Sequence, residues 1–92
     1  MYRTLRLCSS RGAFEAIPDP PMRLDLADVR DKFAANGTDV VDARVMLIIR
    51  LDHEVTVSRD GRILVKTRDK AAASRIFRQV VRILDLPTTS PS

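Results

Sequence analysis

Few side chains in this sequence could take part in catalysis or bind a metal. The 92 residues include one cysteine, Cys8, and one histidine, His53. A nucleophilic cysteine needs a neighbouring base and a third group that orients the base, and no such partners surround Cys8 in the sequence. His53 has no second ligand at the spacing that metal sites use. Asp39 and Asp42 could act as general acid and base, but nothing near them predicts the burial that tunes a carboxyl pKa. We expect these two to bracket a loop, and we expect no catalytic residue, no metal site and no cofactor.

Arginine is the side chain that the sequence offers in quantity for binding. The net charge is +4, yet residues 1–58 carry eight basic and nine acidic side chains. Residues 59–82 carry eight basic side chains against Asp60 and Asp69. This asymmetry predicts one positive face that attracts an anionic partner, although a solvated face that keeps the protein soluble would give the same pattern. The candidate partner-binding residues are Arg59, Arg62, Arg68, Arg75, Arg78 and Arg82.

The last three of these arginines lie in a predicted helix. Asp69 is a suitable N-cap, and the helical spacing of apolar residues continues to about Leu84. The predicted buried stripe consists of Ala73, Ile76, Phe77, Val80, Val81 and Leu84. The three arginines follow the opposite side at spacings of three and four, and no Glu on this helix neutralises them. An unpaired row of this kind favours an anionic partner.

A β-hairpin precedes this helix. A three-residue loop of Arg59, Asp60 and Gly61 would place Gly61 at the left-handed bulge position. This structural turn pairs apolar residues on the inner face and one ion pair on the outer face. The expected pairs are Val57 with Ile63, Val55 with Val65, and Glu54 with Lys66.

The strand before the hairpin, predicted over residues 44–51, is apolar on both sides. Its inner side would carry Val45, Leu47, Ile49 and Leu51, with Leu51 opposite Val55 and Ile49 opposite Val57. Met46 and Ile48 would lie on the other side. A strand that is apolar on both faces is usually central in its sheet, or is covered by a second layer or a partner.

The remaining elements complete a small α+β domain. Met22 to Leu24 is expected to form a short edge strand, and a helix follows from the N-cap Asp25 to Gly37. Leu26, Val29, Phe33 and Ala34 are expected to form the buried side of this helix. The predicted fold is βαβββα, with a mainly antiparallel sheet and both helices on one face. We expect residues 1–20 to be a flexible basic tail, residues 21–86 to be the domain, and residues 87–92 to be disordered.

The ordered series of residues resembles the carboxy-terminal domain of ThiF/MoeB-type adenylyltransferases, the ubiquitin-activating-like enzymes. The resemblance covers roughly residues 22–81. Asp60-Gly61-Arg62 is similar to the DGR turn of that family, and Ser58 and Arg59 stand where Phe-Pro is usual. The other matching residues are Thr56, Val57, Val65, Lys66, Ala71, Ala73 and Phe77. In that family the adenylation chemistry belongs to a nucleotide-binding domain with a Gly-rich phosphate loop. Because this chain has only three scattered glycines, the resemblance implies an accessory domain standing alone.

Two main classes of function are compatible with these features, and a small-molecule-sensing βαβββα module that acts as a dimer is a further alternative. The first is a non-catalytic protein-interaction module that docks on an acidic partner, such as an adenylyltransferase or a ubiquitin-like sulfur carrier. The second is a small nucleic-acid- or ribosome-associated protein that binds through the basic segment from Arg59 to Arg82. The longest apolar run, Val45 to Ile49, is far below the roughly 18 residues that a membrane span needs. We expect a cytoplasmic protein, with organellar targeting by the Arg- and Ser-containing residues 1–14 as the alternative.

Overall fold

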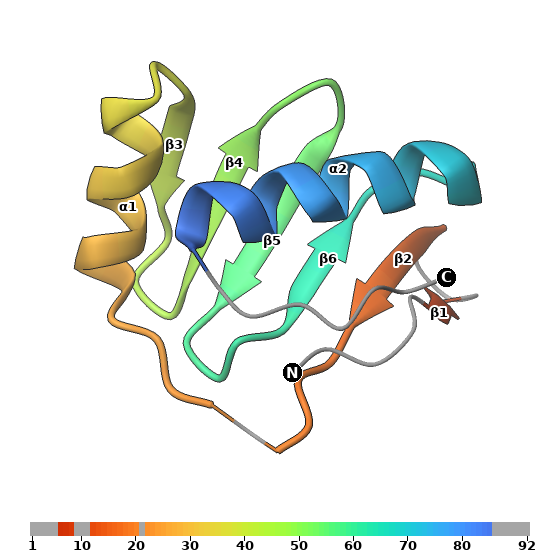
Figure 1. Ribbon diagram of the computed structural model, residues 1–92, viewed down its shortest axis with the longest axis horizontal. Helices are drawn as coiled ribbons and strands as arrows, with labels where there is room; N and C mark the ends of the chain where they lie inside the picture. Colours follow the sequence, from red (N-terminus) through yellow and green to blue (C-terminus); the bar gives the residue numbers. More distant parts are fainter. Residues whose placement is uncertain (1–5, 9–11, 21, 86–92) are drawn as a thin grey trace.

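The computed structural model describes residues 6–8, 12–20 and 22–85. These residues form one antiparallel sheet of six strands in the order β1-β2-β6-β5-β4-β3, and two helices cover one face of it (Figure 1). The strands are β1 (Arg6–Cys8), β2 (Ala13–Ala16), β3 (Asp39–Asp42), β4 (Met46–Arg50), β5 (Glu54–Ser58) and β6 (Ile63–Val65). The helices are α1 (Leu26–Ala35) and α2 (Lys70–Leu84). The predicted α+β class is confirmed, and neither helix is long and apolar enough to cross a membrane.

The hydrophobic core fills the space between the sheet and the helices. Every second residue of a strand points to the same face, and the inward residues of the central strands are fully buried. They are Leu47, Ile49, Val55, Val57, Ile63 and Val65. Helix α1 packs over β3 and β4 and adds Val29 and Phe33, whereas α2 packs over β6 (Figure 1). All six residues of the predicted α2 stripe are buried, which confirms that interpretation.

The register of the β5–β6 hairpin is confirmed. Val57 pairs with Ile63 and Val55 pairs with Val65. The Gly61 N–H donates to the Ser58 carbonyl at 3.0 Å, and the Ser58 N–H donates to the Arg62 carbonyl at 2.9 Å. Gly61 has φ +89°, which is the left-handed conformation that the bulge requires.

Both predicted N-caps are also confirmed. The Asp25 carboxylate accepts the Ala27 N–H at 3.0 Å, and the Asp69 carboxylate accepts the Ala71 N–H at 3.0 Å. Each carboxylate satisfies a backbone donor that has no partner within its helix. Helix α1 ends in a Schellman motif, in which the N–H of Thr38 donates to the carbonyl of Phe33 and Gly37 has φ +75°.

The first strand lies elsewhere than the sequence predicted. Met22–Leu24 is not a strand; it is a loop whose Leu24 N–H donates to the Arg59 carbonyl at 2.8 Å. The strand that pairs with β6 is β2, within residues 1–20 that were expected to be a flexible tail. Phe14 pairs with Val65 there and is buried. The pattern was missed because alanine, which flanks Phe14-Glu15 on both sides, is depleted in strands. The expected tail at 87–92 and most of residues 1–11 lie outside the described residues.

Four further expectations were wrong. Asp39 and Asp42 do not bracket a loop, because they begin and end the edge strand β3. Strand β4 pairs two residues out of the expected register, with Ile49 opposite Val55, because the reversal lies over residues 51–53 instead of 52–54. The shift by two keeps the same side chains in the core. Strand β4 starts at Met46, so Val45 is 62% exposed instead of buried. In α1 the predicted Ala34 contact is also wrong, since Ala34 is exposed.

Candidate interaction surface

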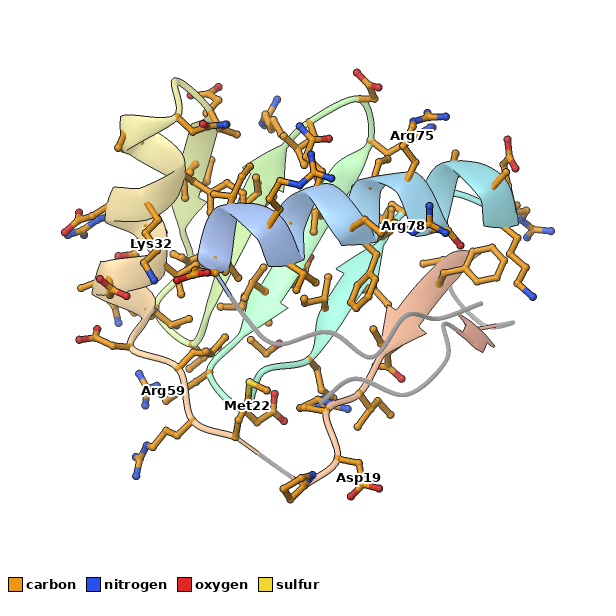
Figure 2. All side chains as sticks on the ribbon, in the orientation of Figure 1. Asp19, Met22, Lys32, Arg59, Arg75 and Arg78 are labelled. Atoms are coloured by element: carbon orange, nitrogen blue, oxygen red, sulfur yellow. The ribbon has the colours of Figure 1, made fainter. Side chains whose placement is uncertain are left out.

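The outer surface of α2 carries the most concentrated group of candidate binding residues. Arg75, Arg78 and Arg82 are all exposed, whereas the buried stripe of the helix faces the sheet. Figure 2 shows the side chains of Arg75 and Arg78 on α2. Their spacing of three and four residues puts the three guanidinium groups on one side of the helix. We call these three residues the α2 arginine row.

The α2 arginine row has no acidic neighbour within bonding range among the described residues. The ion pairs found among the described residues involve other basic side chains, namely Arg30, Lys32, Arg62 and Lys66. Helix α2 has no acidic residue in its first turn beyond the N-cap Asp69. The row is therefore available to an anionic group from outside the described chain.

Lys32 links α1 to the C-terminal end of α2. Its Nζ atom donates to the carbonyl of Leu84 at 3.2 Å, and the same atom lies 3.4 Å from Asp28 Oδ2. Figure 2 shows Lys32 between α1 and the last turn of α2. The C-terminal carbonyls of a helix carry partial negative charge, so a cation is stabilised there. The sequence analysis did not identify this contact, which joins residues 52 positions apart.

The structure separates Arg62 from the α2 arginine row. The Arg62 Nε atom lies 3.1 Å from Asp60 Oδ2, and its Nη1 atom lies 3.7 Å from Glu15 Oε2. Glu15 pairs with Leu64 in the sheet, and both side chains point to the face that α2 does not cover. Arg62 is thus paired with acids and lies on the other side of the sheet.

Arg59 and Arg68 lie apart from the α2 arginine row and from each other. Arg59 is exposed in the β5–β6 turn, where Figure 2 shows it well apart from Arg75 and Arg78. Arg68 lies against the turn between β1 and β2, because a Cβ atom added at Gly12 would be 3.0 Å from Arg68 Nε. The six candidate arginines therefore do not form one face. Only the three on α2 are brought together.

The side chains considered for catalysis or metal binding are also kept apart. Asp39 and Asp42 lie three residues apart in β3, so their side chains point to opposite faces of the sheet. The Asp42 carboxylate accepts the Arg44 N–H at 2.8 Å and lies 3.7 Å from Arg30 Nη1. His53 is half-buried in the β4–β5 turn. Across residues 6–8, 12–20 and 22–85, no three His, Cys, Asp or Glu side chains are grouped as metal ligands would be.

Within the part of the chain that the structure describes, the Glu54 carboxyl group has a shifted pKa. The hydrogen bond and the charge of Lys66 hold the pKa of Glu54 below its ordinary value, and Arg50 lowers this pKa further. The Lys66 Nζ atom lies 2.7 Å from Glu54 Oε2, which is the cross-strand pair expected from the sequence. Both side chains belong to the uncovered face of the sheet. This shift reflects a surface ion pair and not a buried acid prepared for catalysis.

The face of the sheet that no described helix covers, called here the uncovered face, carries apolar side chains, of which the sequence analysis placed only Ile48. Val41 pairs with Ile48, Ile48 pairs with Thr56, and Thr56 pairs with Leu64. Val41 is 44% exposed, and Ile48 and Leu64 are partly exposed. None of the three belongs to the core cluster or packs against it. This row crosses four strands on the side away from the helices.

Comparisons of this chain with protein-family models, with curated proteins and with solved structures find no match.

Proposed function

We propose that this protein is a non-catalytic interaction module that binds an acidic protein through α2. The observation that carries this proposal is the α2 arginine row, which is exposed and has no acidic partner among the described residues. Arginine forms planar, bidentate hydrogen bonds with carboxylates and is less strongly hydrated than lysine. Three guanidinium groups on a rigid, well-packed helix suit a partner with a cluster of Asp and Glu side chains. Long-range attraction between the two surfaces would speed their association.

The resemblance to the carboxy-terminal domain of ThiF/MoeB-type adenylyltransferases narrows the proposed partner. It supports a component of a sulfur-carrier or ubiquitin-like activation system, either an adenylyltransferase or the small carrier protein itself. A cytoplasmic location follows from that assignment. The observed DGR turn and Asp-initiated helix are compatible with the resemblance, and the identity of the partner depends on the sequence pattern alone.

Nucleic acid is the second candidate partner, because the same arginine row would attract phosphate groups. The hairpin gives this candidate less support. The outward side chains of β5 and β6 include Thr56, Ser58 and Leu64, none of which can stack on a base. Arg62 already pairs with Asp60 and Glu15, whose negative charges weaken its attraction for a phosphate. We therefore favour the protein partner.

Changing Arg75, Arg78 and Arg82 together to Gln tests the proposal. Glutamine keeps the helix propensity and leaves the buried stripe untouched, so the free energy of unfolding should change by less than about 1 kcal/mol. Wild-type protein immobilised at moderate salt should retain one acidic protein, identified by mass spectrometry, and the triple variant should lose it. Arg23, Arg30 and Arg44 changed to Gln form the matched control, since the charge removed is equal and all three residues are exposed on other elements. That control should retain the partner.

Binding to unrelated RNA and DNA provides the other half of the test. A protein partner predicts weak binding to bulk nucleic acid by wild type. If nucleic acid is the partner, wild type should instead bind unrelated strands at about micromolar affinity, with a steep dependence on salt. The triple variant would then lose affinity and part of that salt dependence. This second result, together with no stable protein partner, would overturn the proposal.

A further inference from the structure

The uncovered face of the sheet has a pattern that a solvated face does not need. An antiparallel sheet with helices on one side usually presents polar residues on the other. Here the row across β3, β4, β5 and β6 is Val41, Ile48, Thr56 and Leu64. Val41 is one of the three most exposed large apolar residues in the described ranges. Apolar side chains that are contiguous on a surface, with charged neighbours, are typical of an interface.

The neighbouring row on the same face consists of charges that alternate in sign. Asp39 pairs with Arg50, and Arg50 pairs with Glu54. Lys66 continues the row, since its N–H donates to the Glu54 carbonyl and its Nζ atom lies 2.7 Å from Glu54 Oε2. Read from β3 to β6, the charges are negative, positive, negative and positive.

When the same row of a second copy is read in the opposite direction, each charge meets a charge of the opposite sign. A two-fold axis that runs parallel to the strands, between β4 and β5, places β3 of one copy against β6 of the other. Asp39 then faces Lys66 of the second copy, and Arg50 faces Glu54. The same axis places Val41 against Leu64 and Ile48 against Thr56. One symmetry operation therefore matches both rows.

We propose that this face is the interface of a homodimer, in which two copies pack sheet against sheet. Other occupants match the face less well. A polyanion such as nucleic acid would meet the carboxylates of Asp39, Glu54 and Glu15 on the same surface. A partner whose surface carries a single charge sign would be attracted by two residues of the charged row and repelled by the other two, and the repulsion costs free energy. A second copy satisfies both signs and also covers the apolar row.

The dimensions of the molecule set the upper limit for the area of the proposed interface. The molecule measures 28 × 26 × 21 Å along its principal axes. Figure 1, which looks down the shortest axis, shows the sheet spread across the two longer directions behind the helices. The two rows span four strands that lie about 4.8 Å apart, so a standard interface of roughly 800 Å² per partner would use the whole breadth of this face. In such a dimer the two copies of α2 lie on opposite outer surfaces, so the α2 arginine row stays accessible.

Sedimentation of the full chain tests the dimer directly. We expect wild type to sediment at twice the 10.3 kDa of one chain at about 10 µM, in the range for an interface of this area. Ile48→Lys should sediment as a monomer and should melt at the temperature of wild type that has been diluted until it is monomeric, because Ile48 lies outside the core cluster and the dimer adds stability only while it is formed. Arg75→Gln, on the far side of the molecule, is the matched control and should remain a dimer. Wild type that is monomeric at about 100 µM would overturn the proposal.

Two charge variants distinguish a loss of the dimer from a loss of folding, because only folded variants can form a dimer when they are mixed. Arg50→Glu with Lys66→Glu makes the whole row negative, and Asp39→Lys with Glu54→Lys makes it positive. Each variant alone should be monomeric, because its row repels a second copy of itself. An equimolar mixture should restore a one-to-one dimer, which is detectable by native mass spectrometry. Variants that self-associate alone, or a mixture that stays monomeric, would show that this face is not the interface.

Discussion

At the scale of single residues, Gly61 is the glycine, of the three in the chain, at which an added Cβ atom meets the closest contacts. Its φ of +89° is strained for any residue with a side chain, and a Cβ atom there would overlap Met22 Cγ and lie 2.9 Å from Met22 Sδ and 3.1 Å from Pro18 Cγ. Pro18 and Met22, which lie about 40 residues before the hairpin in the sequence, thus pack against the DGR turn. The glycine is required both by the bulge and by this packing.

Gly61→Ala should lower the free energy of unfolding by about 2 kcal/mol or more, since the strain of a positive φ and the steric overlap add. Gly37→Ala is the matched control: Gly37 also has a positive φ, but nothing lies within 4 Å of its added Cβ atom. The control should cost only about 1 kcal/mol. Urea denaturation of the three proteins measures both differences. Equal costs for the two substitutions would contradict the packing of Met22 and Pro18 over the turn.

At the scale of elements, β2 decides how the sheet is completed. Without it, β6 would have an open edge, and the N-terminal half of the chain would contribute only α1, β3 and β4. β2 pairs with β6 through Phe14, Glu15 and Ala16, and the Phe14 ring enters the core. The β2 residues are therefore part of the folded domain.

Phe14→Ala should destabilise the protein by about 3–5 kcal/mol, which is the usual cost of removing a buried phenyl ring. Phe14 is 6% exposed, whereas Ile17, just after the strand, is 39% exposed. Ile17→Ala is the control and should change stability by less than about 1 kcal/mol. The midpoints of urea unfolding give the comparison. An unchanged midpoint for Phe14→Ala would restore the interpretation of these residues as a tail.

Helices α1 and α2 show how local signals and packing agree. Each begins at an Asp that accepts backbone N–H groups, and each buries its apolar stripe against the same sheet. The Lys32 contact with the Leu84 carbonyl links the C-terminal end of α2 to α1. The charged side of α2 is consequently held on a rigid scaffold, which favours binding because little conformational entropy is lost.

At the scale of the whole molecule, the two proposed surfaces lie on opposite sides of the sheet. The α2 arginine row is on the helical side, and the rows that start at Val41 and Asp39 are on the uncovered side. A dimer that uses the uncovered side would carry two outward α2 surfaces and bind its acidic partner twice.

The two surfaces should behave independently, because variants that are far apart and share no contact have additive effects. Ile48→Lys should keep the affinity of a single site for the acidic partner while losing the dimer. The Arg75, Arg78 and Arg82 triple variant should keep the dimer while losing the partner. Calorimetric titration and sedimentation of the same samples measure both properties. A triple variant that becomes monomeric would place α2 in the dimer interface and contradict the arrangement.

The sequence alone determined the elements whose signals are local. The Asp69 N-cap with its 3.6-residue apolar period predicted α2, and the loop of Arg59, Asp60 and Gly61 predicted the hairpin register. These features depend on neighbours within a few residues, so their physical causes are readable in the chain. The concentration of arginine in residues 59–82 is also a property of sequence.

Only the tertiary structure decided which residues share a surface. Pairing across the sheet brought Phe14 into the core and joined Arg62 to Glu15, and neither contact has a local signal. A run of basic residues that passes through a turn, a strand and a helix is distributed to different sides, because successive side chains of a strand point to opposite faces and those of a helix point around its axis. The six candidate arginines were therefore separated, with three kept on α2. The position of the helices over the sheet likewise decided the two faces of Met46–Arg50. One face belongs to the core, and the other belongs to the surface proposed for the dimer.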